Sequence, residues 1–355
     1  MDKYKIDNHK LNYHIPVLNN WLNNEKIYPI YIEVSPSGIC NHRCTFCALD
    51  FMEYQKRFLD PNVFEKCVRE MSQLGIKSIM FAGEGEPLLH KHISEMILST
   101  KKTGIDVALT TNGVLLNECL SEKILPNVEW VKVSINAGTK KTYSIIHQTK
   151  ENDFEKVINN IKKAVLIKKE QQYSCAIGMQ LILIPENHEE VILLAQKAKD
   201  LSVDYLVIKP YSHHYSSKTN KYEKLTYKSF YYLSEKLESM NTNEFNVIFR
   251  INTMKKWDEN ERTHKKCLAL PFWSYIDAGG NVWGCSAYLQ NERFRYGNIN
   301  DDSFKNIWDG EKRMNSLRWV ENNLNIEHCR TNCRMDNVNK YLWDLKHPPP
   351  HVNFI

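Results

Sequence analysis

Three cysteines, Cys40, Cys44 and Cys47, lie close together in the segment GICNHRCTFCALD with the spacing C-x3-C-x2-C, and no fourth cysteine lies nearby. A [4Fe–4S] cluster usually takes four cysteine ligands. Three thiolates therefore predict a cluster with one iron left open to another ligand. Zinc is the alternative, but structural zinc sites usually pair two close cysteine doublets, which this segment does not supply.

Four more cysteines lie in the C-terminal third of the chain: Cys267, Cys285, Cys329 and Cys333. Four thiolates suffice for one fully ligated [4Fe–4S] cluster. Zinc held by the same four thiolates is the alternative. A cluster without an open iron cannot bind a substrate directly, so we expect this second site to carry electrons.

The composition favours a soluble globular protein, with 42% hydrophobic and 25% charged residues among 355. The formal net charge of +5 comes from scattered lysines, which gives little support for nucleic-acid binding. No apolar stretch is long enough to cross a membrane, and the N-terminus lacks the apolar core of a signal peptide. We therefore expect a cytoplasmic protein, in which ten cysteines indicate metal binding or catalysis before disulfides.

Six apolar segments with strand character alternate with amphipathic helical segments such as 60–75 and 152–169. The strand segments are 27–35, 77–83, 105–112, 130–136, 175–184 and 204–210. This alternation predicts an α/β fold with a parallel sheet. Six strands are fewer than the eight of a closed barrel, so we expect a partial (β/α)6 barrel. Its chemistry should lie at the carboxyl ends of the strands, where the following loops meet.

The pattern changes after about residue 211, where a polar loop begins. Two helical segments follow, and then two short strand patterns flank the sequence Ala-Gly-Gly-Asn within 272–288, which predicts a hairpin. We therefore predict a small α+β unit after the barrel. The expected divisions are a lead-in at 1–27, the barrel at 28–215, linker helices at 216–262, the α+β unit at 263–340 and a tail at 341–355.

The cysteine trio after the first strand resembles the defining motif of the radical S-adenosylmethionine (SAM) superfamily. Further motifs follow the next strands: GEGEPLL (83–89), TTNG (110–113) and VSINAGT (133–139). GEGEPLL resembles the family's Gly-Gly-Glu-Pro motif, with Glu84 in place of the first glycine. The resemblance implies SAM contacts at Phe46, Gly85, Glu86, Asn112, Ser134 and Gln180.

In that family the open iron binds the amino and carboxylate groups of SAM. Reductive cleavage then yields a 5′-deoxyadenosyl radical that abstracts hydrogen from the substrate. The resemblance also implies a reducing electron donor such as flavodoxin or ferredoxin.

The second cysteine set resembles the SPASM and Twitch extensions of some radical SAM enzymes. Cys267, Gly280 and Cys285 give C-x12-G-x4-C, and the segment 295–319 resembles the one that follows their hairpin. A full SPASM domain would bind two clusters through more cysteines. Because only Cys329 and Cys333 remain, the shortened Twitch form with one auxiliary [4Fe–4S] cluster is the better match.

These features predict a radical SAM enzyme that oxidises or epimerises a small polar substrate such as a sugar, aminocyclitol or nucleotide sugar. Lys209, Tyr211 and His213 end the sixth strand and are candidate proton acceptors or mouth residues. Cys175 is the candidate hydrogen-atom donor for an epimerase, and Asp336 is a candidate to reach the barrel. Peptide modification is one alternative. A non-enzymatic iron–sulfur electron carrier or redox sensor is the other.

Overall fold

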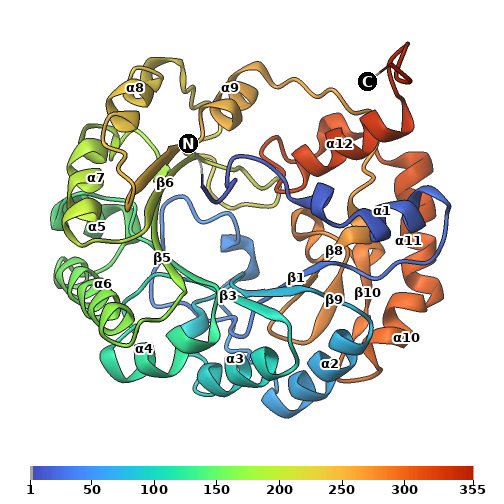
Figure 1. Cartoon of the computed structure of the whole chain (residues 1–355), viewed down its shortest axis with the longest axis horizontal. Helices are drawn as coiled ribbons and strands as arrows, with labels where there is room; N and C mark the ends of the chain where they lie inside the picture. Colours follow the sequence, from blue (N-terminus) through green and yellow to red (C-terminus); the bar gives the residue numbers. More distant parts are fainter. Residues whose placement is uncertain (1–2, 355) are drawn as a thin grey trace.

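The computed structural model describes residues 3–354; the predicted lead-in and tail extend beyond it at residues 1–2 and 355. Within the described part, one ten-stranded sheet has the order β10-β9-β8-β1-β2-β3-β4-β5-β6-β7. Helices surround the curved sheet (Figure 1). The strands are β1 (Tyr31–Val34), β2 (Ser78–Phe81), β3 (Asp106–Thr111), β4 (Trp130–Ser134), β5 (Ala176–Leu183), β6 (Tyr205–Pro210), β7 (Asn246–Phe249), β8 (Trp273–Ile276), β9 (Asn281–Trp283) and β10 (Arg295–Asn298).

Helices follow most of the strands and bring the chain back to the start of the next one. They are α1 (Ile15–Leu22), α2 (Pro61–Gln73), α3 (Ile93–Lys102), α4 (Glu118–Ile124), α5 (Lys140–His147), α6 (Asn152–Glu170), α7 (Val191–Asp200), α8 (Leu233–Glu238), α9 (Ile251–Glu259), α10 (Phe304–Asp309), α11 (Glu311–Asn323) and α12 (Asp336–Lys346). Strands β1 to β6 pair in parallel with their sequence neighbours. The predicted partial barrel with a C-terminal extension is confirmed.

Side-chain alternation along the strands separates an outer core from the barrel interior. On β4, Val131 and Val133 belong to the hydrophobic core between sheet and helices. Trp130 instead packs with other residues inside the barrel, and Lys132 shares its face of the strand because successive side chains point to opposite faces. The interior is therefore more polar than the outer core, which leaves room for chemistry.

Helix α2 shows why the first crossover forms where it does. The Asp60 carboxylate accepts hydrogen bonds from the backbone N–H groups of Asn62 (2.8 Å) and Val63 (3.1 Å), and Pro61 occupies the first turn. Phe64 and Val68 lie on one face and are fully buried. Burying side chains of this size stabilises the fold by about 1.5–3 kcal/mol each.

The sheet extends beyond the six predicted strands at both of its edges. β7 lies in the segment 216–262, where only linker helices were predicted, and it pairs in parallel with β6. Its apolar run, residues 247–249, is flanked by polar residues, so the sequence shows no clear strand pattern there. At the other edge β8 pairs in parallel with β1, so the C-terminal unit continues the barrel sheet.

The predicted hairpin is present in the C-terminal unit. Strands β8 and β9 pair in an antiparallel manner around Gly279 and Gly280, and β10 continues the antiparallel ladder. Gly280 has φ of +83°, a backbone conformation that glycine adopts without strain. A second hydrophobic core under this unit joins it to α1, which Figure 1 shows beside α11 and α12.

The N-terminal segment covers one end of the barrel. Tyr4 and Ile6 pack against Ala176 and Tyr205, the first residues of β5 and β6, and against other interior side chains. Asp7 accepts a hydrogen bond from Arg250 Nε at 2.9 Å. In Figure 1 the segment crosses from the side of β6 towards α12. The N-terminal segment therefore packs over part of the barrel end that lies opposite the strand carboxyl ends.

Among the helices of residues 3–354, none combines the length and the apolar character that a bilayer span requires.

Candidate functional site

The cysteine trio lies on the loop between β1 and α2, at the carboxyl ends of the strands. All three thiols are free and partly buried. Burial, the Glu86 carboxylate and Cys47 raise the pKa of Cys40 to about 12. Burial and the other two cysteines raise the pKa of Cys44. The sulfur atoms are thus close enough to repel one another as thiolates, which is the arrangement that a shared metal cluster neutralises.

Backbone contacts hold this loop in place. The N–H groups of Arg43 and Thr45 donate to the carbonyl oxygens of His147 (3.0 Å) and Ile146 (2.8 Å) at the end of α5. The N–H of Glu86 donates to Ile39 O at 2.8 Å. A Cβ on Gly85 would lie 2.2 Å from Ser37 O, so only glycine fits. The sequence predicted Gly85 for close approach to a ligand; the structure shows that it approaches the cysteine loop.

His147 is a site residue that sequence reasoning missed. Its Nδ1 lies 3.0 Å from Cys44 Sγ, and its Nε2 donates to Ile135 O at 2.9 Å. Burial and nearby His42 lower its pKa to about 3, so the ring is neutral. Ligand atoms of His42, Cys44 and His147 lie within 4.8 Å of one another. No spacing in the sequence connects positions 44 and 147, so only the fold reveals this contact.

The predicted SAM-contacting residues Glu86 and Asn112 are both buried and are joined to each other. Glu86 Oε2 accepts a hydrogen bond from the Asn112 N–H at 2.7 Å, and Oε1 accepts one from Thr111 Oγ1 at 2.5 Å. The Asn112 side-chain amide donates to Asn41 Oδ1 in the cysteine loop at 2.7 Å. These residues therefore fix the ends of β2 and β3 against the loop that carries the trio.

Ser134, Gln180 and Phe46 lie around the same end of the barrel. Gln180 Nε2 donates to Ser134 Oγ at 3.3 Å, which places both side chains inside the barrel on β5 and β4. Phe46 is buried against Ile184 and Tyr211, with Cys44 beside it. The structure thus brings together the motifs of four successive strand ends, although they lie far apart in the sequence.

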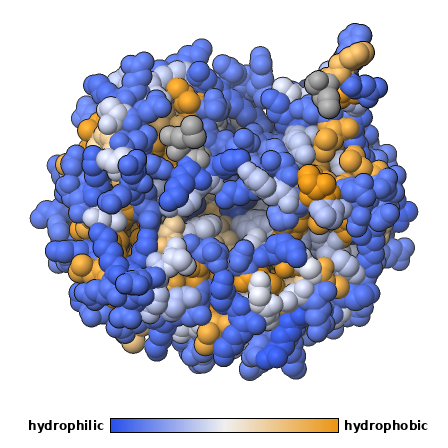
Figure 2. All heavy atoms as spheres, in the orientation of Figure 1, coloured by the Kyte–Doolittle hydropathy of each residue, from blue (hydrophilic) through white to orange (hydrophobic). Residues whose placement is uncertain are grey.

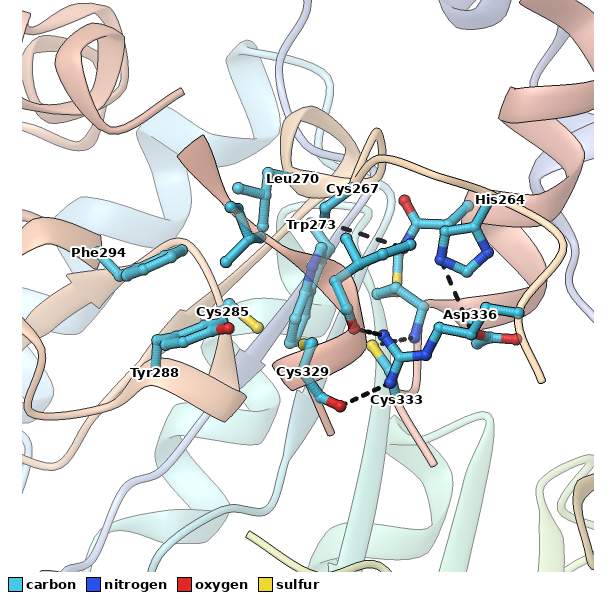
Figure 3. A pocket seen from close by; sticks show the side chains of 15 residues that line it. His264, Cys267, Leu270, Trp273, Cys285, Tyr288, Phe294, Cys329, Cys333 and Asp336 are labelled. Atoms are coloured by element: carbon cyan, nitrogen blue, oxygen red, sulfur yellow. Dashed lines mark hydrogen bonds and ion pairs between the residues drawn. The ribbon is translucent and has the colours of Figure 1, made fainter. Parts of the chain in front are cut away.

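The second cysteine set lines a single pocket in the C-terminal unit. Figure 3 shows the four cysteines around the same space, which apolar side chains such as Leu270, Trp273 and Phe294 enclose. Burial raises the pKa of Cys267 to about 12, and Cys333 and Cys329 add to the effect. Four free thiols facing one apolar cavity fit a fully ligated [4Fe–4S] cluster.

Three arginines near the second set were not predicted. Arg262 donates to the carbonyl oxygens of Cys329 (2.6 Å) and Arg330 (2.7 Å), which holds this ligand loop. Arg334 reaches into the barrel, where it pairs with Glu33 of β1. The sequence pointed to Asp336 for this reach and was wrong: Asp336 pairs with Lys256 and lines the cluster pocket. The ion pair of Arg334, which follows Cys333, thereby connects the second cysteine set to β1.

The predicted mouth residues lie on the segment that follows β6. The Tyr211 side chain is fully buried, and its hydroxyl lies 3.2 Å from His213 Nδ1. His213 lines an open pocket that also includes Trp257, Cys329 and Arg330. Lys209 lies two residues earlier and faces the barrel interior, so it is set deeper than the other two.

The structure does not support Cys175 as a hydrogen-atom donor. Cys175 is buried in the core between sheet and helices, immediately before β5 begins. It therefore lies at the barrel end opposite the strand carboxyl ends, separated from the cysteine trio by the length of an eight-residue strand. Because side chains alternate between the two faces of a strand, the sequence alone could not tell whether Cys175 faces the barrel interior. The packing places it outside the barrel.

Comparison with known families shows to which superfamily the chain is related. The radical SAM superfamily matches residues 34–198, and the SPASM iron–sulfur cluster-binding domain matches residues 267–334. The chain belongs to the radical SAM superfamily. Its cofactors are SAM and two [4Fe–4S] clusters, one of the radical SAM domain and an auxiliary one of the SPASM-type domain. A radical SAM enzyme also needs a reductant.

Curated relatives match part of the chain. The GTP 3′,8-cyclase of Chlorobaculum tepidum is 27% identical over 197 residues, 54% of this chain and 57% of that protein. A probable GTP 3′,8-cyclase of Pyrococcus horikoshii is 35% identical over 134 residues, 38% of this chain and 42% of that protein. The chain spans about half the length of the curated relatives it matches.

Solved structures of radical SAM enzymes share the fold. Streptococcus suis SuiB bound to S-adenosylmethionine has a TM-score of 0.67 and 18% identity, covering 86% of this chain and 72% of that one. The enzyme anSMEcpe with bound AdoMet has a TM-score of 0.60 and 19% identity, covering 82% and 84%. At these identities the likeness shows the fold.

Proposed function

We propose that this radical SAM enzyme oxidises a small polar substrate at the carboxyl end of the barrel. The observation that carries the proposal is that the segment 211–217 lies between the two cysteine sets. Ser217 Oγ donates to Cys47 O at 3.4 Å. Burial, with Cys285 and Cys329 nearby, raises the pKa of Tyr215 to about 12. A substrate held under this segment is next to both centres.

The residues divide into three roles. Cys40, Cys44 and Cys47 hold the SAM-binding cluster, and the second set holds the auxiliary one. These groups supply the radical that abstracts hydrogen and accept the electron that leaves the substrate. The proton lost in an oxidation needs a protein acceptor, and we assign His213 because it lines an open pocket and contacts Tyr211.

Oxidation is favoured over epimerisation by the position of the remaining thiols. An epimerase of this kind needs a hydrogen-atom donor beside the substrate, and a thiol serves that purpose. All ten cysteines lie within the described residues. Of the three outside the cluster sets, Cys67 is buried in the core on α2, Cys175 is buried in the same core just before β5, and Cys119 is exposed on α4.

A small polar substrate is supported by the polar side chains of the barrel interior, such as Lys132, Ser134 and Gln180. The relatives named as GTP cyclases act on a small polar molecule. SuiB has been seen with its precursor peptide SuiA, so a peptide is the competing substrate class. An electron carrier would need neither the SAM motifs nor an open iron, and membership of the superfamily argues against it.

The test uses anaerobically reconstituted enzyme with SAM, dithionite and a panel of small polar metabolites and peptides. Mass spectrometry should find 5′-deoxyadenosine and a product two mass units lighter than its substrate. Deuterium entry from D2O with no other mass change would show epimerisation and contradict the proposal.

Two variants separate the centres. Cys44→Ala should abolish 5′-deoxyadenosine formation. Cys285→Ala should lower the iron content from about eight to about four per chain, retain SAM cleavage and lose the oxidised product. Cys119→Ala, at an exposed thiol, is the control and should behave as the unmodified enzyme. Oxidised product from Cys285→Ala enzyme would remove the auxiliary centre from the reaction.

A further inference from the structure

Two lysines face the barrel interior on strands β4 and β6. Lys132 lies between the outward-facing Val131 and Val133, and its ammonium group lies 5.0 Å from the centroid of the interior Trp130 ring. Lys209 follows Ile208, which belongs to the outer core, so its side chain points inward. Both keep part of their surface exposed, although they are surrounded by the barrel. The space they face is therefore open to water.

Two arginines lie close to these lysines. The Arg250 N–H donates to Ile208 O at 2.9 Å, which places Arg250 next to Lys209 at the edge of the sheet. Arg330 comes from the SPASM-type domain and donates to Ser212 O at 3.3 Å. The charges of Lys132, Arg250 and Arg330 all add to burial in lowering the pKa of Lys209. The four cations thus act on one region of the interior.

Among the described residues, the interior carboxylates that form ion pairs do so with arginines and not with these lysines. Asp7 pairs with Arg250, and Glu33 pairs with Arg334. Within residues 3–354, neither Lys132 nor Lys209 forms an ion pair with a carboxylate. Buried charges are normally paired, because an unpaired one costs much free energy. An excess of positive charge in a water-accessible cavity indicates that an anionic ligand completes the site.

We propose that Lys132 and Lys209 bind a phosphate or diphosphate group of the substrate inside the barrel. This rests on the proposed function, because it names the class of molecule that the same site oxidises. Lysine ammonium groups serve as point-charge ligands of phosphate. A single carboxylate would offset one positive charge and leave the other lysine unpaired. A diphosphate carries enough charge to offset both.

The lowered pKa of Lys132 reduces the amount of positive charge that the site carries before a ligand binds. Burial and Arg250 lower the pKa of Lys132 to about 8, so part of this amine is neutral near pH 8. Binding of a phosphate favours the protonated form. Ligand binding should therefore be accompanied by proton uptake in this pH range, and calorimetry in buffers of different ionisation enthalpy measures it.

The test is titration of inorganic pyrophosphate into the anaerobically reconstituted holoenzyme with SAM bound. Isothermal titration calorimetry should show saturable binding with uptake of protons at pH 8. Lys132→Met and Lys209→Met should each weaken the binding at least tenfold, and Lys132→Arg should restore most of it. Lys162→Met, at an exposed position on α6, is the matched control and should bind as the unmodified enzyme.

Three outcomes would overturn the proposal: no pyrophosphate binding to the unmodified enzyme, binding that both methionine variants retain, or displacement of SAM by pyrophosphate. The last would mean that the lysines serve the cosubstrate. Dithionite-driven 5′-deoxyadenosine formation without substrate is measured in parallel. If SAM is cleaved but pyrophosphate does not bind, the phosphate site alone is wrong; if SAM is not cleaved, the proposed function fails.

Discussion

The Glu86 carboxylate joins three segments of the site. It accepts hydrogen bonds from Asn112, Thr111 and the Leu88 N–H, all of which are buried. Burial raises the pKa of Glu86, and these hydrogen bonds oppose that effect by favouring the charged form. The residue predicted to contact SAM is therefore also one that aligns β2 and β3.

Glu86→Gln should impair both SAM binding and the alignment of β2 with β3. A glutamine amide would place an NH2 group opposite buried N–H or O–H donors, so one of them loses its acceptor. We expect a loss of about 1–3 kcal/mol in stability and at least tenfold weaker SAM binding. Thermal unfolding and SAM titration measure the two effects. Glu155→Gln, at an exposed position on α6, should change neither; unaltered SAM affinity in Glu86→Gln would contradict the contact.

His214 predicts a pH dependence of stability. The ring is buried and stacks on Phe51 at a centroid distance of 4.4 Å. Burial, with Arg330 nearby, lowers its pKa to about 3. Below pH 6.5 the unfolded chain binds a proton that the folded chain does not, so this residue reduces stability as the pH falls towards about 3.

Replacing His214 with Phe should lessen the acid sensitivity. Between pH 7.5 and 5.0 the folded protein should lose about 1–2 kcal/mol less stability than the unmodified one. Unfolding midpoints at the two pH values measure this difference, with His351→Phe in the exposed tail as control. An equal acid-induced drop in the His214 variant and the unmodified protein would refute the assignment.

At the scale of elements, the site depends on the close packing of the cysteine loop against the turn after β2. Gly85→Ala should displace this loop, because the added Cβ would collide with backbone oxygens of Ser37 and Ile39. We expect iron to fall from about eight to about four per chain, since the trio no longer holds its cluster.

Gly104→Ala is the matched control for this prediction. Gly104 has φ of +85° but no atom near an added Cβ, so alanine there costs about 1 kcal/mol of backbone strain away from the site. It should lower the unfolding midpoint and leave the iron content unchanged. Full iron content in Gly85→Ala protein would show that the close approach does not matter for cluster binding.

The elements that the sequence predicted are those with a strong local pattern. All six barrel strands, helices α2 and α6, the hairpin and both cysteine sets follow from apolar periodicity, capping and spacing. Strand β7 was missed because its apolar run, residues 247–249, is flanked by polar residues, and the pairing of β8 with β1 has no local signal. The contacts of His147 with Cys44 and of Arg334 with Glu33 join residues far apart in the chain, so only packing creates them.

At the scale of the whole molecule, the barrel and the SPASM-type domain share one sheet. β8 continues it from β1, and residues of α1 share a hydrophobic core with β8 and α12. The two family matches, 34–198 and 267–334, therefore share one sheet, and a shared core packs across their junction. Figure 2 shows a surface that is mostly hydrophilic, with a hollow at the centre of the face drawn.

Truncation tests this continuity. A chain ending at residue 262 would expose the edge of β1 and the apolar residues that pack on the C-terminal unit, such as Leu18 and Ile27. We expect it to be insoluble or to bind apolar dyes strongly. A chain ending at residue 346 loses the tail after α12, of which residues 347–354 are exposed, and should remain soluble. A soluble, cooperatively folding 1–262 fragment would show that the barrel is autonomous.

The N-terminal segment packs across the first residues of β5 and β6, at the barrel end opposite the cysteine trio. The loops at the carboxyl ends of the strands are therefore the part of the chain that shapes the entrance a substrate of the proposed site would use. Exchange of these loops should alter which molecules are accepted while the sheet beneath stays the same.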